Sequence, residues 1–175
     1  VVLANVSNLS GEQVAAIRQF VASGGGLIAT HETSLCDEKG RRRTDFALAD
    51  ILGVKYRKTL PSAPRALALE PGSPVGTGLA SSTPSHDEPH VEVDVTTGKI
   101  AASITGDDLG TVKLPAVIVN NFGKGRSVYL PGRLDAMQCK LPNLFIERLF
   151  ADAVRWAAND LIPLRVTADG IVAVS

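Results

Sequence analysis

Apolar and polar residues in the first thirty positions follow the pattern of a strand, a helix and a second strand. Apolar runs occupy 1–6 and 27–30. Between them, Ser10 and Gln13 have the spacing of a helix capping box, which predicts a helix over 11–23. A run of three glycines then ends that helix. We therefore expect a βαβ unit with a right-handed crossover between parallel strands.

The rest of the chain predicts one short helix, a strand-rich region and one long helix. Thr44 is expected to cap a helix over 45–52 that Gly53 stops, and the Pro-, Ser- and Gly-rich region 55–89 predicts short strands and long loops. Alternating residues beyond it predict strands, and two apolar runs around a glycine-rich turn predict a β-hairpin. The expected strands cover 91–95, 100–105, 114–121 and 127–130, and the last helix covers 143–158.

The length, hydrophobic content and charge of the chain limit the classes of protein to which it can belong. The chain has 175 residues, 45% of them hydrophobic, which is enough for one well-packed domain. Eighteen basic and eighteen acidic residues give no net charge, so we expect neither nucleic acid nor a membrane surface as a partner. The two cysteines, Cys36 and Cys139, are expected to be reduced. The sequence leaves the compartment open, and we favour the cytoplasm.

The two ends of the chain predict a part of a longer protein. The sequence opens at Val1, inside an apolar run that predicts a buried strand, so we expect an upstream strand and helix to be supplied elsewhere. One domain is expected over 1–160. Residues 161–175 predict strands around a turn at Asp169-Gly170, as at the start of a C-terminal β segment or a further domain.

Three stretches carry a resemblance to a known family: LSGEQVAAIRQFVASGGGLIATHETSL, DEKGRRRTDFALADILGV and PAVIVNNFGKGRSVYLPG. They resemble the middle, or trimerisation, domain of family 42 β-galactosidases, over roughly residues 1–160. The resemblance implies an α/β fold with three layers, flavodoxin-like and class I glutamine amidotransferase-like, with a mainly parallel sheet and a β-rich second half. It also implies a homo-oligomer, trimer or dimer, and a catalytic TIM barrel in the same parent chain.

The amidotransferase-like resemblance also implies where catalytic residues would stand, and this chain lacks them there. The cysteine nucleophile belongs at the turn after the second strand, where His31 stands. The His-x-Glu pair belongs after a late strand, where 131–135 has the sequence PGRLD. We therefore expect a non-catalytic accessory or oligomerisation domain of a glycoside hydrolase, whose catalytic carboxylates lie on the barrel.

Two alternatives stay open. The first is a ligand-binding or hydrolytic protein of the trehalose-utilisation type with the same fold, using His31 with His86 or His90. The second is an amidohydrolase with Cys36 as nucleophile and His31 as base, although the acidic residues around Cys36 raise the pKa of a thiol. The His86 and His90 imidazoles are also metal-capable, but Pro89 interrupts a helical register, so we expect a solvated loop there.

Further candidates for an interface or a ligand site follow the expected parallel strands. Glu32, Arg41, Arg42 and Arg43 lie in the loop after the second strand, and Arg133 follows a late strand. Open α/β sheets place functional surfaces at the carboxyl ends of their strands, so these residues could contact a neighbouring subunit, the barrel or a ligand. No cofactor is expected, because the glycine-rich turn before the 127–130 strand lacks the spacing of a phosphate-binding loop.

Overall fold

The computed structural model describes residues 1–79, 86–140 and 143–159, without the side chains of 86 and 138–140. The elements in chain order are β1 (Val2–Leu3), α1 (Gly11–Ala22), β2 (Gly26–Thr30), α2 (Ala49–Leu52), β3 (Val54–Leu69), β4 (His86–Val95), β5 (Lys99–Thr105), the 3-10 turn η1 (Asp107–Leu109), β6 (Leu114–Phe122), β7 (Gly125–Leu130), α3 (Leu134–Lys140) and α4 (Leu144–Ala157). No helix in these ranges is long and apolar enough to cross a membrane.

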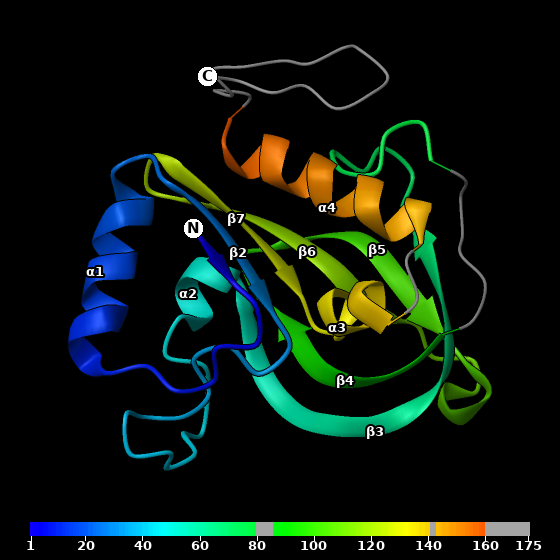
Figure 1. Ribbon diagram of the computed structural model, residues 1–175, viewed down its shortest axis with the longest axis horizontal. Coiled ribbons are helices and arrows are strands. Elements are labelled where there is room, and N and C mark those ends of the chain that lie inside the picture. Colours follow the sequence, from blue (N-terminus) through cyan, green and yellow to red (C-terminus); the bar gives the residue numbers. More distant parts are fainter. Residues whose placement is uncertain (80–85, 141–142, 160–175) are drawn as a thin grey trace.

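The seven strands form one sheet in the order β1-β2-β7-β6-β5-β3-β4 (Figure 1). The β1–β2 and β2–β7 pairs are parallel, and the other four are antiparallel. The expected α/β class is correct, but the expectation of a mainly parallel sheet is wrong, since the sheet is mixed. The reason is the β-rich second half, whose strands β3 to β7 pair with one another in antiparallel fashion within the same sheet.

Helices cover both faces of the sheet, which gives the three expected layers. One core joins α4 to the sheet through Ile146, Leu149 and Ala153. The other core joins α1 and α2 to the opposite face, through Val21 and Ile51 among others. Figure 1 shows α4 lying across one face of the strands, with α1 standing beside the β1 edge.

The local signals at the two long helices and the hairpin are confirmed. Ser10 and Gln13 form both hydrogen bonds of the capping box. The Asn143 side chain accepts from the first turn of α4. The β6–β7 hairpin turns at Gly123, whose φ of +59° is the left-handed conformation that glycine adopts without strain.

Several expected elements differ from those observed. The helix expected over 45–52 begins only at Ala49, because the Asp45 carboxylate accepts from the backbone N–H of Phe46 and Tyr56 and holds 45–48 in turns. The loop expected at 86–90 is the first half of strand β4. Helix α3 lies before the last helix, in a region for which the sequence predicted no element.

The first strand and the Pro-rich region also differ from expectation. The apolar opening forms an exposed edge strand rather than a buried one, since Val2 is 58% exposed. The region expected to hold short strands and long loops begins with β3, a strand of sixteen residues. Its pairing with β4 shifts register between Leu60 and Ala63, and this irregularity accommodates the prolines at 61 and 64.

Candidate functional site at the elbow after β2

The turn that follows β2 is a strained elbow. His31, the first residue after the strand, has a φ of +48°. Asn5 and Ser34, in the adjoining loops after β1 and β2, also have positive φ values. Such conformations cost a residue other than glycine about 1–3 kcal/mol, and they persist where surrounding contacts enforce them. The carboxyl ends of the parallel strands are therefore a site of stored strain.

Buried hydrogen bonds hold the elbow in place. The His31 N–H donates to the carbonyl oxygen of Leu130 at 2.8 Å, which continues the β2–β7 pairing past the end of the strand. The Tyr129 hydroxyl donates to the carbonyl oxygen of His31 at 2.6 Å. The backbone N–H of Asn5 donates to the Thr30 hydroxyl at 2.9 Å. Two segments distant in sequence, the end of β7 and the loop after β1, thus fix one turn.

The hydrogen bonds around Asn5 define the tautomer of His31. Asn5 Oδ1 accepts from the backbone N–H of Glu32 at 3.2 Å, so the amide oxygen faces the elbow. His31 Nδ1 lies 3.3 Å from the same oxygen and must therefore carry the hydrogen. Burial lowers the pKa of His31 and favours the neutral ring, whose Nε2 is then a hydrogen-bond acceptor. That Nε2 is buried and has no partner among the described residues.

Two further buried polar atoms without a partner in the described part of the chain lie near His31. They are Nε of Arg133 and Oδ1 of Asp135, both just beyond β7. Arg133 and Arg42 lower the pKa of His31, and Glu32 and Asp135 raise it, so all four charges act on the imidazole. Two carboxylates and two guanidinium groups therefore act on a neutral ring, and their charges balance.

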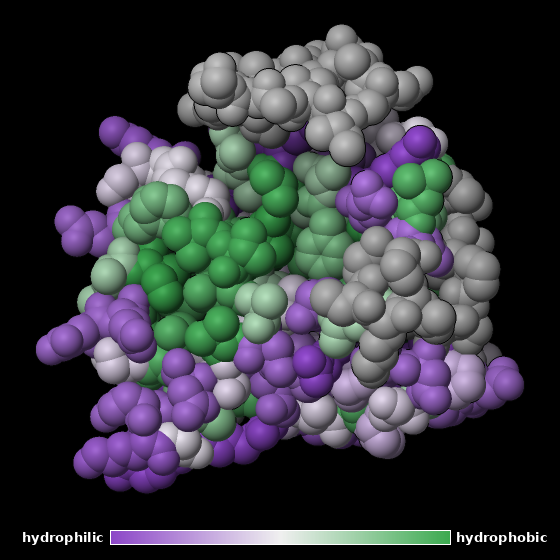
Figure 2. Space-filling view, viewed as in Figure 1, coloured by the Kyte–Doolittle hydropathy of each residue, from purple (hydrophilic) through white to green (hydrophobic). Residues whose placement is uncertain are grey.

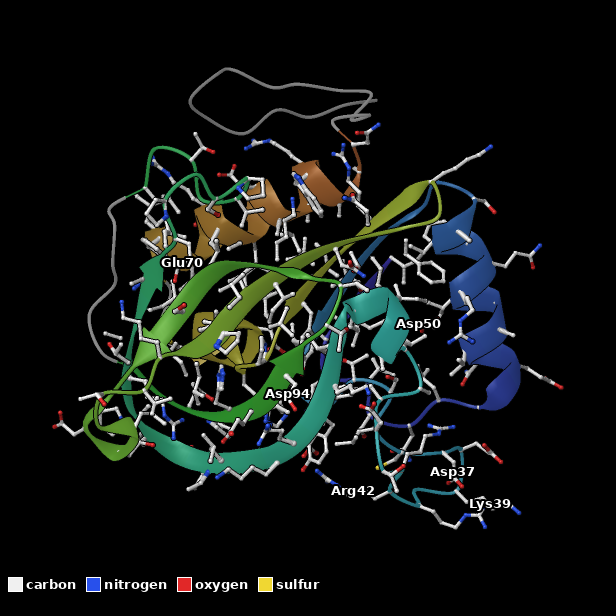
Figure 3. The ribbon with its side chains drawn as sticks, turned by 180° about the vertical axis from the view of Figure 1, so that it is seen from behind. Asp37, Lys39, Arg42, Asp50, Glu70 and Asp94 are labelled. Atoms are coloured by element: carbon white, nitrogen blue, oxygen red, sulfur yellow. The ribbon has the colours of Figure 1, made fainter. Side chains whose placement is uncertain are left out.

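Glu32 and Arg42 tie the elbow loop to β3. The Arg42 guanidinium donates to Glu32 at 2.9 Å and to the Tyr56 hydroxyl at 2.6 Å, and the Thr59 hydroxyl donates to Glu32 at 2.6 Å. Burial raises the pKa of Glu32, but the hydrogen bonds from Thr59 and Arg42 outweigh it and hold the pKa below its usual value. Figure 3 shows Arg42 on the same loop as Asp37.

The arginines on either side of Arg42 have different roles. Arg43 donates to the backbone carbonyl oxygens of Leu9 and Cys36, so its guanidinium supports the loop from within. Arg41 pairs with Asp37 at 2.7 Å and keeps its side chain 73% exposed. Of the three arginines predicted for an interface or ligand, Arg41 has the most exposed side chain.

Cys36 is a free cysteine of intermediate exposure in the same loop. Its backbone pairs with Asn8 and with Arg42 in isolated bridges. No hydrogen bond joins its sulfur to His31 among the residues that the structure describes. The geometry therefore adds nothing to the hypothesis of a Cys36 nucleophile.

His90 belongs to a different environment from His31. Its ring is buried, its Nε2 donates to the carbonyl oxygen of Pro115 at 2.9 Å, and its backbone bridges to Gly132. His86 lies four residues earlier on β4, which separates the two backbones by about 13 Å. The described residues contain no group of three or more metal-capable side chains. The ring of His90 thus binds the backbone of β6, whereas the ring of His31 faces Asn5.

The largest described cavity lies at the opposite end of the central strands. It has a volume of about 570 Å³ and is lined by Lys99, Asn121 and Trp156 among others. Asn121 pairs with the beginning of β7, whereas His31 adjoins its end. The elbow and this cavity are therefore separate features of the domain.

Sequence reasoning missed Asn5, Tyr129 and Asp135 as members of the elbow site. Asp135 lies in the stretch 131–135, where an amidotransferase would have its His-x-Glu pair. That position alone could have marked it as a candidate site residue. Asn5 and Tyr129 act through backbone groups far away in the sequence, and no motif marks them.

Comparison with known proteins identifies the fold and the family. Residues 1–157 match the family described as the β-galactosidase trimerisation domain. The chain is 31% identical over 138 residues to β-galactosidase BbgII of Bifidobacterium bifidum, which covers 76% of this chain and 19% of the relative. A solved β-galactosidase from Bacillus circulans sp. alkalophilus has a TM-score of 0.75 at 20% identity, over 97% of this chain and 24% of that chain.

A ThuA-like protein from Bacteroides uniformis also shares the fold, with a TM-score of 0.67 at 16% identity over 89% of this chain and 67% of that chain. These structural likenesses show the fold alone. The curated relatives are much longer, and the chain spans 19% and 18% of two of them. The expected family and the flavodoxin-like fold are both confirmed, and the chain belongs to the family of β-galactosidase trimerisation domains.

Proposed function

We propose that this chain is a non-catalytic accessory domain that helps to assemble the subunits of a larger glycoside hydrolase acting on β-galactosides. The family match over residues 1–157 carries the proposal. The β-galactosidase from Bifidobacterium bifidum, at 31% identity, supports the class of parent enzyme. The elbow supports the non-catalytic role, because an imidazole with an acceptor nitrogen stands where an amidotransferase holds its thiol.

Assembly into a trimer is the state we propose for the parent, with a ring of heterologous contacts. The exposed part of the elbow loop, centred on Arg41, is the proposed contact on this domain. It projects from the carboxyl ends of the strands, where α/β domains place functional surfaces. The Arg41 side chain is 73% exposed and, among the described residues, pairs only within its own loop. A partner subunit could therefore bind it without unfolding any part of this domain.

Solution mass by light scattering, across a range of concentrations, tests assembly directly. We expect self-association that Arg41→Glu weakens. Arg57→Glu is the matched control, since Arg57 is also exposed and paired with one carboxylate, Asp94. A wild-type chain that is monomeric at every concentration would show that this domain does not assemble by itself.

An exposed apolar surface supports the view that the domain packs against another part of a longer chain. Val1, Val2, Phe20 and Val154 are 56%, 58%, 43% and 42% exposed, and they line a groove of about 260 Å³. Figure 2 shows the apolar area between α1 and α4. A contiguous surface of this kind marks an interaction site. We call it the β1 surface.

The occupant that we propose for the β1 surface is a strand and helix of the parent chain. A strand could extend the sheet beyond the free side of β1, and its helix would lie beside α4 over Val2. In a longer chain that includes this segment, Val2→Asp should lower the melting temperature without changing the subunit number. Val112→Asp, at a position 55% exposed and outside the β1 surface, is the control. A change in subunit number would instead assign the surface to a second copy.

A further inference from the structure

We propose that the elbow binds a neutral polyhydroxylated ligand, such as a hexose, through His31, Arg133 and Asp135. This binding site is independent of the assembly role. It rests on two separate observations, which are the strained backbone of His31 and three buried polar atoms that lack partners in the described structure.

The hydrogen-bonding capacity of the three atoms defines the ligand. His31 Nε2 is an acceptor, because Nδ1 carries the ring hydrogen toward Asn5. Asp135 Oδ1 is a second acceptor, and Arg133 Nε–H is a donor. A hydroxyl group both donates and accepts, so one hydroxyl can donate to His31 while it accepts from Arg133. A second hydroxyl can donate to Asp135. Two hydroxyl groups therefore have the donor and acceptor capacity that the three atoms require.

The charges around the site balance, so they give no net attraction for an ionic ligand. An anion would meet the carboxylates of Glu32 and Asp135 and the lone pair of His31. A cation would meet the guanidinium groups of Arg42 and Arg133, which act on the same ring. A ligand without net charge meets neither repulsion, and it does not have to lose the hydration of an ion when it is buried.

Access to the site requires movement. His31 is only 7% exposed, and the three unpartnered atoms are closed off from solvent in this conformation. Arg133 and Asp135 lie at the junction between β7 and α3, so displacement of this junction would open the site. Buried polar atoms without partners are unfavourable, and a bound hydroxyl group would remove that cost.

Three sugars that share the same pyranose ring but differ in charge test the proposal on the unmodified chain. D-galactose is neutral, D-galactosamine carries an ammonium group and D-galacturonate carries a carboxylate. We expect calorimetric binding of D-galactose, with a change in the ¹⁵N shift of His31 Nε2, and at least about tenfold weaker binding of both charged sugars. Equal binding of all three, or no binding of D-galactose, would overturn the proposal.

Variants locate the site. Asp135→Asn should weaken D-galactose binding at least about tenfold, since a neutral amide oxygen is a weaker acceptor than a carboxylate oxygen. Asp152→Asn is the matched control, because Asp152 is an aspartate on α4 that is paired with Arg155, away from the elbow. A crystal structure with D-galactose that showed only an ordered water between the three atoms would assign them a structural role and contradict the ligand site.

Discussion

The buried hydroxyl of Tyr129 donates to the carbonyl oxygen of His31 at 2.6 Å, across 98 residues of sequence. This bond joins the penultimate residue of β7 to the elbow after β2. Burial raises the pKa of Tyr129 well above its usual value, so the hydroxyl keeps its hydrogen and acts as a donor throughout the ordinary pH range. Among the bonds that hold the strained turn, this one is made by a side chain from a neighbouring strand.

Removing this hydroxyl should destabilise the domain. We expect Tyr129→Phe to lower the free energy of unfolding by about 1–2 kcal/mol, because the His31 carbonyl oxygen loses its buried donor. Tyr56→Phe is the comparison, since Tyr56 is the other tyrosine and its hydroxyl lies in a partly exposed network. Urea unfolding followed by fluorescence measures both. An equal decrease in the free energy of unfolding in both variants would show that the elbow hydrogen bond contributes no more to stability than the Tyr56 hydroxyl.

The stability of the domain should fall as the pH falls below about 6.5, partly through His31. Burial lowers the pKa of His31 below its value of 6.5 in an unfolded chain, despite the opposing effect of Glu32. The neutral ring therefore contributes stability above pH 6.5, and this contribution is lost as acid protonates the unfolded chain more readily than the folded one.

The variant His31→Asn tests this contribution of His31 to the pH dependence of stability. Asparagine tolerates the positive φ and cannot take up a proton, so the variant should lose less stability than the wild type between pH 7 and the folded pKa. Denaturant midpoints at a series of pH values give the difference. Parallel curves for the two proteins would contradict the predicted role of His31.

Arg65 on β3 should be far more important for stability than Arg57 on the same strand. Arg65 is 2% exposed, and its guanidinium donates to Asp108 at 2.6 Å and to the carbonyl oxygens of Glu88 and Pro61. We expect Arg65→Ala to cost about 3 kcal/mol, because these groups lose a buried partner. Arg57→Ala removes an exposed pair with Asp94 and should change the stability very little, because water screens the pair. Thermal melts of the two variants test the contrast.

Gly26 should tolerate no side chain. A β-carbon there would overlap the carbonyl oxygen of Ala157, so α4 packs directly on the backbone of β2. We expect Gly26→Ala to cost about 1–3 kcal/mol, since the helix must shift. Gly11→Ala is the control, because a β-carbon at Gly11 would meet no atom within 4 Å and alanine favours the helix. A Gly26→Ala domain as stable as the wild type would show that α4 moves freely.

Sequence reasoning succeeded where the signal was local. The capping box at Ser10, the last helix and the β6–β7 turn each depend on residues within a few positions of one another. It failed for β3, because Pro61 and Pro64 predict a break, and the pairing irregularity that accommodates them depends on β4. The burial of Arg65 was equally inaccessible, since its partner Asp108 lies 43 residues away.

The candidate site was predictable only in part. His31 was expected at the elbow, and Arg133 was named as a ligand candidate. Their proximity follows from the parallel pairing of Thr30 with Leu130, which brings the loops after β2 and β7 together. The pattern of residues predicts two such strands but not that they are neighbours. The tautomer of His31 depends in addition on Asn5, which only the folded chain places beside it.

The pairing of β3 has a consequence for how the domain unfolds. Its first part pairs with β4 and its last four residues pair with β5. Strand β4 in turn meets the segment after β7, where the Val91 N–H donates to Pro131 at 3.1 Å. Strands β7, β6, β5, β3 and β4 thus form a nearly closed circuit, so no single strand can detach without breaking contacts on two sides. The domain should therefore lose its structure in one cooperative step, with the slowest-exchanging amides distributed around that circuit.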